Sequence, residues 1–229
     1  MGVCCSSRIN VIDQEQRALI NQILEFWFLT EDQWDRHTCG PPAERWTECW
    51  FCYKNAAEND AFIKENFGGA LEKLVSGEYN GWEHDRDGRL AAILCYDQFS
   101  RNIHRKSPQA FATDPKALKI VKEIVRSKDP TMNLSAYKYG ELLFVLMPLM
   151  HSENSNDTQL CLNEYTRLHE EMEADESITW GLNANIKAAA NHNTTIEKFG
   201  RYPTRNAALG RTNTEAEMVY LESAETYGQ

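Results

Sequence analysis

Three groups of polar side chains each follow an apolar stretch, and their residue types could bind an anion and move a proton. Guanidinium groups offer rigid, bidentate donors to carboxylates and phosphates. We therefore expect these groups, from distant parts of the sequence, to line one polar cavity in a helical core. They are Asp97, Gln98, Arg101, Asn102 and Arg105 in the segment DQFSRNIHR; His151, Ser152, Glu153 and Asp157; and His192 with Arg201, Arg205, Asn206 and Arg211.

Two histidines beside these groups could serve as a general acid or base, because imidazole titrates near neutral pH. In this hypothesis His151 or His192 moves the proton, Glu153 orients the imidazole, and Arg101 and Arg201 hold the charge of a substrate. The alternatives stay open: each histidine could cap a helix, and each arginine could form a structural ion pair.

A metal site is an alternative for the same region, since two imidazoles and carboxylates can make an open catalytic site. It would use His151, Glu153 and His192, with Asp97 as a further ligand. The His-x-Glu spacing is common by chance, so no metal is predicted. No P-loop, dinucleotide glycine fingerprint or nucleophile elbow occurs in the sequence, and no cofactor is predicted either.

The segment MGVCCS at residues 1–6 fits an acylation signal, with Gly2 as the myristoyl acceptor and Ser6 at the preferred hydroxyl position. One myristoyl chain binds membranes only marginally, so a second signal is needed. Cys4 and Cys5 could provide it as palmitoylation sites, because Arg8 is the only cation among the first 16 residues. The alternative is a terminus whose Gly and Cys residues have no such role.

Composition limits the partners and the compartment. The net charge is −10 and the pI about 5.1, which argues against nucleic acid as a partner. The longest apolar run, 142–150, is too short to span a bilayer. With no secretion signal, we expect reduced cysteines and read the CxxC of Cys49 and Cys52 as buried helix residues. The expected location is cytoplasmic, peripheral to a membrane through the acylated terminus.

Apolar residues recur at helical spacing along the chain, and no alternating strand pattern occurs. The sequence predicts an all-α fold of antiparallel helix pairs in a single domain, residues 13–229, behind an acylated tail, residues 1–12. The predicted helices are 13–29, one or two in 46–67 that end or bend at Gly68 and Gly69, 70–75, 90–99, one starting at Asp114, one capped by Ser135, 156–172, 178–198 and one capped by Thr214.

Four ordered motifs give the chain a family resemblance. The segments LAAILCYDQFSRNIHR, AFATDPKA and PLMHSE, and the segment FGRYPTRNAALGR after His192, resemble the family catalogued as domain of unknown function 924, over about residues 17–222. The resemblance implies a fold similar to tetratricopeptide-repeat proteins, with no assigned activity. Ser100, Lys106 and Gln159 depart from the family pattern. The implied motif residues are Asp97, Gln98, Arg101, Asn102, Arg105, His151, Glu153, His192, Arg201, Arg205 and Asn206.

Three functional hypotheses follow. The polar groups could form a pocket for an anionic small molecule or an acidic peptide, with or without histidine chemistry, so the sequence leaves open whether the protein is an enzyme. The alternative is a non-catalytic, membrane-anchored scaffold for protein interactions. In a scaffold all of these guanidinium groups should be paired with carboxylates or hydrogen-bonded to backbone carbonyls. The oligomeric state is not predicted.

Overall fold

The computed structural model describes residues 11–30, 32–34, 50, 56–171 and 176–224, and within these ranges every regular element is helical. The all-α prediction is confirmed. The α-helices are α1 (Gln14–Phe28), α2 (Ala56–Ser76), α3 (Arg86–Ile93), α4 (Ser100–Ile103), α5 (Asp114–Arg126), α6 (Tyr139–Val145), α7 (Met147–Met150), α8 (Ser155–Glu171), α9 (Glu176–Phe199) and α10 (Glu215–Leu221).

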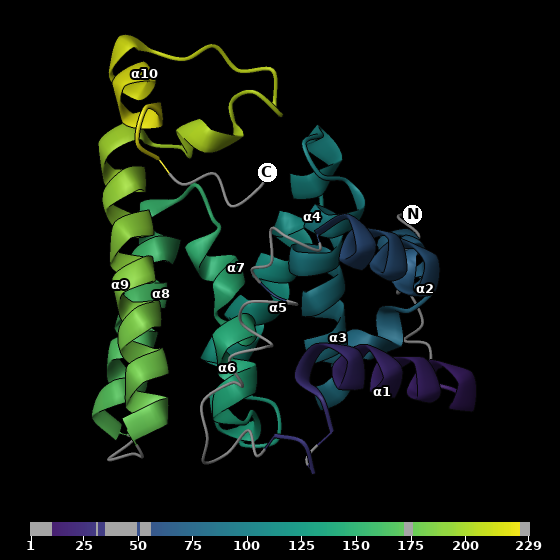
Figure 1. Cartoon of the computed structure of the whole chain (residues 1–229). Coiled ribbons are helices and arrows are strands. Elements are labelled where there is room, and N and C mark those ends of the chain that lie inside the picture. The colour runs from purple at the N-terminus through teal and green to yellow at the C-terminus, as the bar shows by residue number, and fades with distance from the viewer. Residues whose placement is uncertain (1–10, 31, 35–49, 51–55, 172–175, 225–229) are drawn as a thin grey trace, which may run out of the picture.

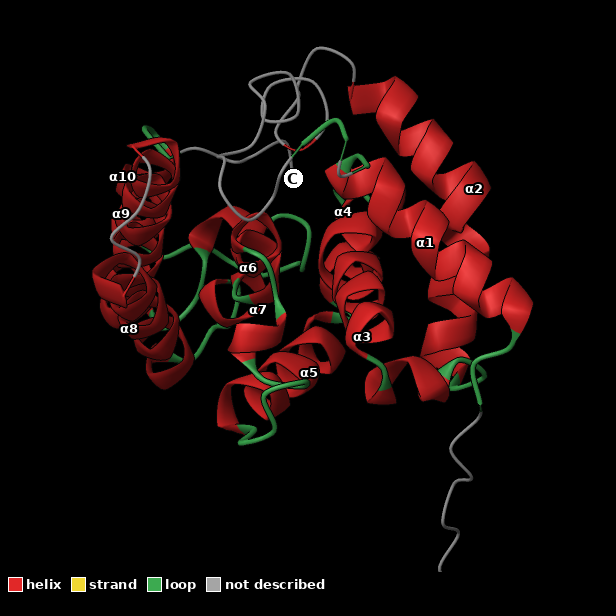
Figure 2. Ribbon diagram, turned by 90° about the horizontal axis from the view of Figure 1, so that it is seen from below, coloured by secondary structure: helices red, strands yellow, loops and turns green. Residues whose placement is uncertain are grey.

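The helices form three groups. Figures 1 and 2 show α8 and α9 side by side on one flank, α1 and α2 on the opposite flank, and α3, α5, α6 and α7 between them. Helix α10 packs across the end of α9 (Figure 1). This arrangement is compatible with the tetratricopeptide-like fold that the resemblance implies. Asp97 lies in η3 (Leu94–Phe99), His151 follows α7, and His192 lies in α9.

Local sequence signals explain several helix starts. Asp13 accepts a hydrogen bond from the backbone N–H of Gln16 at 2.8 Å, and Thr214 with Glu217 forms a capping box for α10. Both caps were predicted. The predicted cap at Ser135 is wrong, because Ser135 lies in the short 3₁₀ turn η5 (Leu134–Ala136) and α6 begins later, after Lys138.

The predicted break at Gly68 and Gly69 is also wrong, since α2 runs through both glycines. Its buried face is formed by Ile63, Phe67 and Leu71 at helical spacing, with Ala70 and Leu74. Burying each large apolar side chain stabilises the fold by about 1.5–3 kcal/mol. Two glycines cost about 1 kcal/mol each in a helix interior, so packing of this face outweighs them.

A continuous run of buried helix crosses the middle of the molecule. Helix α3 continues into the π-helical segment η3 (Leu94–Phe99) and then into α4, and all residues from 88 to 101 are buried. A Cβ on Gly88 would lie 2.6 Å from the carbonyl oxygen of Trp82, so only glycine allows this close approach. The polar segment that begins at Asp97 is therefore inside the core.

Aromatic side chains fill the core beside this run. Trp27 of α1 contacts Phe99 and Phe144 edge-on, with ring centroids 5.5 and 5.3 Å apart. Trp50 stacks on Trp27 at 6.3 Å and donates from its indole N–H to the Trp27 carbonyl. Such pairs add about 0.5–1.5 kcal/mol each beyond burial. They fix η3 against α1 and α6.

Some sequence predictions fall outside the described residues, namely those for Gly2, Cys4, Cys5, Cys49 and Cys52. Cys95 and Cys161 are buried free thiols, and burial raises the pKa of both. Among the described helices, none combines the length and the apolar character that crossing a bilayer requires.

Candidate functional site

A buried carboxylate and a histidine form the centre of the site. Asp97 lies in η3 and is 1% exposed, and His151 lies at the C-terminal end of α7. The Nδ1 atom of His151 is 2.8 and 3.0 Å from the two carboxylate oxygens of Asp97. The side-chain amide of Gln98 donates to the same carboxylate at 2.5 Å. The π-helical turn of η3 presents Asp97 toward α7, and such turns are frequent at functional sites.

Opposing effects set the charge states of this pair. Burial would raise the pKa of Asp97, but the positive charge of Arg101 and the hydrogen bonds to His151 and Gln98 lower it below its usual range. Burial lowers the pKa of His151 more than the Asp97 carboxylate raises it, and Arg101 lowers it further. The imidazole is therefore neutral at pH 7, with the Nδ1 hydrogen donated to Asp97 and the lone pair on Nε2.

A second carboxylate holds two arginines from distant segments. Asp114, the first residue of α5, accepts from both Nη atoms of Arg101 at 2.9 and 3.1 Å. Nη1 of Arg205, in the 3₁₀ turn η6 (Pro203–Arg205), reaches the same carboxylate at 3.2 Å. The cap of α5 is instead Thr113, whose hydroxyl donates to the Tyr96 carbonyl. The sequence predicts Asp114 only as a helix start, and in the structure its carboxylate is an acceptor shared by two arginines.

Aromatic rings hold the guanidinium group of Arg205. Its central carbon lies 4.7 Å from the ring centroids of both Phe111 and Tyr202. The side chain is 12% exposed, and both burial and the nearby charge of Arg101 lower the pKa of Arg205. An arginine still remains charged at all physiological pH values. The stacking fixes the plane of a charged group that is mostly removed from water.

His192 of α9 adjoins the centre from the other flank. Its ring centroid is 6.3 Å from that of His151 and 5.5 Å from that of Tyr202. Nδ1 of His192 donates to the Ala188 carbonyl at 2.8 Å, and burial lowers the pKa of the imidazole to about 4. His192 is therefore neutral. We use the name central cluster for Asp97, Arg101, Asp114, His151, His192 and Arg205.

Glu153 does not orient the imidazole, contrary to our expectation. Its two carboxylate oxygens accept from the Nη atoms of Arg211 at 2.8 Å each, and one also accepts from the backbone N–H of Tyr202. Asp97 takes the orienting position beside His151. Glu153 was the expected partner of the imidazole because it is only two residues from His151 in the sequence. The chain turns after α7, however, and directs Glu153 toward the 200–211 segment.

Arg105 and Asn102 do not line a shared cavity with Arg101, contrary to our expectation. Helix α4 ends at Ile103, so Arg105 no longer continues the helical spacing. Its guanidinium group meets Asp60 of α2 at 2.7 Å, and the Asn102 amide donates to the same carboxylate at 2.8 Å. These two residues attach the end of the central run to α2 and do not join the central cluster.

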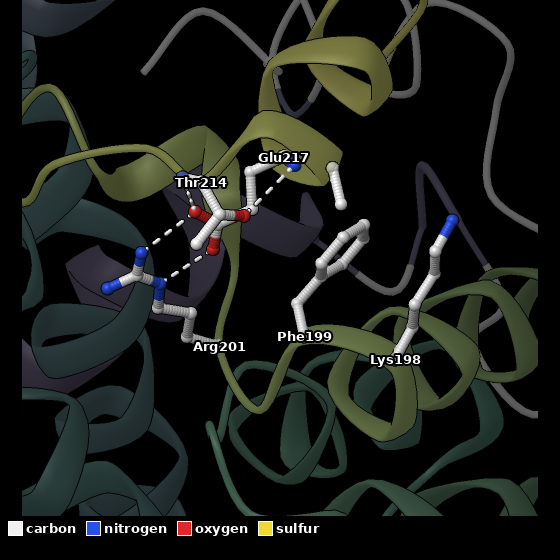
Figure 3. Close-up of a pocket in the computed structure, with 6 residues that line it drawn as sticks. Lys198, Phe199, Arg201, Thr214 and Glu217 are labelled. Carbon is white, nitrogen blue, oxygen red and sulfur yellow. Dashed lines mark hydrogen bonds and ion pairs between the residues drawn. The ribbon is translucent and has the colours of Figure 1, made fainter.

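Arg201 and Asn206 likewise lie apart from the central cluster. Arg201 donates to both carboxylate oxygens of Glu217 at 2.7 and 2.8 Å, and the Asn206 amide lies 3.4 Å from one of them. Figure 3 shows Arg201 directed toward Glu217 and Thr214. These side chains lie beside a pocket of about 540 Å³. The pocket is lined by Lys198, Phe199, Arg201, Thr214, Ala216 and Glu217.

Four residues with a role in these contacts were missing from our predicted site: Asp60, Phe111, Asp114 and Tyr202. Phe111, Asp114 and Tyr202 stand within the motifs that carry the family resemblance, so the motifs themselves were a usable signal for three of them. Asp60 had no such signal, because it precedes its partner Arg105 by 45 residues and stands outside these motifs.

The metal alternative finds no geometric support in the described part of the chain, where no group of three or more histidine, cysteine or acidic side chains is placed to hold an ion. His151 and His192 are near each other, but Glu153 is engaged with Arg211. The donor set that the metal alternative requires is therefore not assembled.

The fold and the site define an all-helical protein with a buried cluster of acidic, basic and imidazole groups. Residues 23–225 match the family model described as "Bacterial protein of unknown function (DUF924)", and the chain belongs to this family. A solved structure, that of the protein of unknown function ATU0120 from Agrobacterium tumefaciens, is similar, with 26% identity and a TM-score of 0.70. The similarity covers 91% of this chain and 99% of that one. No curated protein matches the chain.

Proposed function

We propose that the central cluster binds an anionic small molecule or the end of an acidic peptide and uses His151 for general acid–base chemistry. The observation that carries this proposal is the Asp97–His151 pair beside Arg205. A carboxylate on Nδ1 fixes the tautomer and leaves Nε2 as the reactive atom. The side chain of His151 is 17% exposed, so a ligand can approach it.

Arg205 supplies the anion-binding part of the proposal. Of its guanidinium donors only Nη1 is used within the described residues, on Asp114 at 3.2 Å. A buried guanidinium group is costly to desolvate and normally engages several acceptors. A ligand carboxylate or phosphate would satisfy the remaining N–H groups. In this function His151 accepts a proton from the ligand or donates one to it, while Asp97 acts as a positioning residue.

A screen of small anionic metabolites for turnover tests the proposal. We expect His151→Ala and Asp97→Asn to lower the activity by at least 100-fold, since general acid–base catalysis contributes about 10²–10⁴-fold. His84→Ala is the matched control, because His84 is exposed in the 3₁₀ turn η2 (Asn80–His84). Activity that survives both His151→Ala and His192→Ala would remove the proton-transfer role.

A second candidate function, a non-catalytic scaffold, has one observation in its favour. The five arginines of the polar sequence groups all form ion pairs with carboxylates. The pairs are Arg101 and Arg205 with Asp114, Arg105 with Asp60, Arg201 with Glu217, and Arg211 with Glu153. This is the pattern expected of groups that only join helices. The incomplete pairing of Arg205 is what favours the anion site over the scaffold.

The proposal includes a membrane tether through myristate on Gly2 and palmitate on Cys4 or Cys5. Its support is the MGVCCS sequence alone. Mass spectrometry of the N-terminal peptide from eukaryotic cells tests it. We expect both lipids on the natural sequence and neither on Gly2→Ala, because palmitoylation needs prior membrane contact. An unmodified Gly2 would remove the tether and leave the central cluster unaffected.

A further inference from the structure

The stacking of Arg205 restricts the shape of any anion that binds it. The rings of Phe111 and Tyr202 contact the guanidinium group, each at 4.7 Å, so additional partners can approach only its N–H edge. Nη1 at this edge is used by Asp114. Nε and Nη2 remain, and these two donors match the two oxygens of a carboxylate in a planar, bidentate contact.

The charges of the central cluster restrict the charge of the anion. The carboxylates of Asp97 and Asp114 balance the guanidinium groups of Arg101 and Arg205, and both imidazoles are neutral. The neighbouring pairs Glu153–Arg211 and Asp157–Lys122 are balanced as well. An added monoanion leaves one uncompensated negative charge and a dianion leaves two, which is costly in a buried site.

The histidine can remove this excess charge. His151 faces Asp97 of η3, Arg101 of α4, His192 of α9 and Arg205 of η6. Asp97 is already bonded to Nδ1, so an added proton would reside on Nε2 and convert the pair into imidazolium and carboxylate. Tyr202 cannot supply that proton, because its hydroxyl donates to the Met150 carbonyl.

We infer that the ligand is a small monocarboxylate, held by the edge of Arg205 and taken up together with one proton on Nε2 of His151. The inference rests on the proposed function and names its substrate class. A free small molecule suits the site better than a peptide, because the side chains of Arg101, Arg205 and His151 are only 11, 12 and 17% exposed. Such burial leaves room for a terminal group and not for an extended chain.

The test is a titration of the full-length protein with sodium acetate, followed through the histidine ring signals by NMR at pH 6, 7 and 8. Sodium chloride keeps the ionic strength constant, and inorganic phosphate is the competing probe. We expect the acetate affinity to fall about tenfold per pH unit above the pKa that His151 has in the complex. We expect phosphate to bind more weakly than acetate at pH 8.

Variants assign the effect to the two residues. Arg205→Gln should lose acetate binding by at least tenfold. Arg201→Gln is the matched control that should keep it, since among the described residues Arg201 bonds only to Glu217 and the Thr212 carbonyl. His151→Gln can still donate to Asp97 but cannot take up a proton, so its acetate affinity should no longer depend on pH. If Arg205→Gln does not fold, Arg205→Lys keeps the charge without the bidentate edge and should also bind at least tenfold more weakly.

The outcomes separate this inference from the proposed function. Tighter binding of phosphate than acetate at pH 8 overturns the monocarboxylate class and leaves an anion site in place. Equal acetate affinity at pH 6 and pH 8 in the wild-type protein overturns the proton uptake alone. Binding of both anions that is unchanged in Arg205→Gln overturns the site itself, and the proposed function with it.

Discussion

Arg201 and Arg205 are four residues apart in one segment, yet they belong to two different kinds of ion pair. Arg201 meets one carboxylate, Glu217, and its side chain is 29% exposed. Arg205 is 12% exposed and shares Asp114 with Arg101. We use the name terminal pair for Arg201 and Glu217. The comparison teaches that residue type and spacing do not distinguish an arginine in a simple ion pair from a candidate binding group. The number of charged groups that share one carboxylate does.

The terminal pair is complete by itself. Both carboxylate oxygens of Glu217 are used, by Arg201 and by the backbone N–H of Thr214, and the contact joins α10 to the segment that follows α9. In the central cluster no pair is complete, because Asp97 serves both His151 and Arg101, and Asp114 serves both Arg101 and Arg205. Removing one member should therefore affect the whole central cluster.

The largest expected effect is that of Asp114→Ala. The change leaves two buried guanidinium groups short of an acceptor, so we expect the free energy of unfolding to fall by about 3 kcal/mol. Urea denaturation measures it. Glu217→Ala, which breaks the terminal pair, is the control and should cost less. Equal losses from the two variants would show that the two regions do not differ energetically.

The second effect is a loss of stability in acid. Burial holds the pKa of His192 at about 4, below the value of about 6.5 in an unfolded chain. The unfolded state therefore binds a proton at a higher pH than the folded state, and stability falls as the pH drops from 6.5 to 4, by on the order of 2–3 kcal/mol.

Denaturation series at pH 7, 5.5 and 4 measure this loss, and His192→Gln should flatten it. The terminal pair responds in a lower window, because Arg201 lowers the pKa of Glu217 to about 2 and its stabilisation is lost only as the pH falls below about 4.5 toward 2. The same acid sensitivity in His192→Gln as in the wild-type protein would contradict the buried, neutral imidazole.

The third effect concerns the aromatic contact that distinguishes Arg205. Phe111→Leu removes a ring that lies 4.7 Å from Arg205 and 5.6 Å from Arg101, and we expect a loss of about 1 kcal/mol. A double-mutant cycle with Arg205→Gln isolates the contact. A coupling energy near zero would mean that Phe111 acts only as core packing.

The smallest effect is that of Arg201→Gln in the terminal pair. Partly exposed ion pairs are screened by salt, so the decrease in Tm should be visible at low ionic strength and nearly vanish in 1 M sodium chloride. The decrease caused by Asp114→Ala should persist in the same salt. Salt dependence of equal size at both positions would remove the distinction between the terminal pair and the central cluster.

Sequence reasoning succeeded where a contact is local. The amphipathic spacing predicted most helices, and Asp13 and Thr214 were correctly placed as caps because their hydrogen bonds span only three residues. It failed at Ser135 and at the Gly68–Gly69 pair, where tertiary packing outweighed local preference. Of the eleven motif residues that the family resemblance implies, five belong to the central cluster. A sixth, Gln98, lies beside it, next to Asp97.

The sequence by itself determined an all-helical chain, its membership of a family and the presence of arginine, histidine and carboxylate groups at helix ends. Only the tertiary structure decided which of them meet. His151 pairs with Asp97 across 54 residues and Arg205 with Asp114 across 91. Such pairings depend on how whole helices pack and on the π-helical turn at Asp97. Charged groups interact through space, whereas the local sequence determines only the secondary structure in which each group lies.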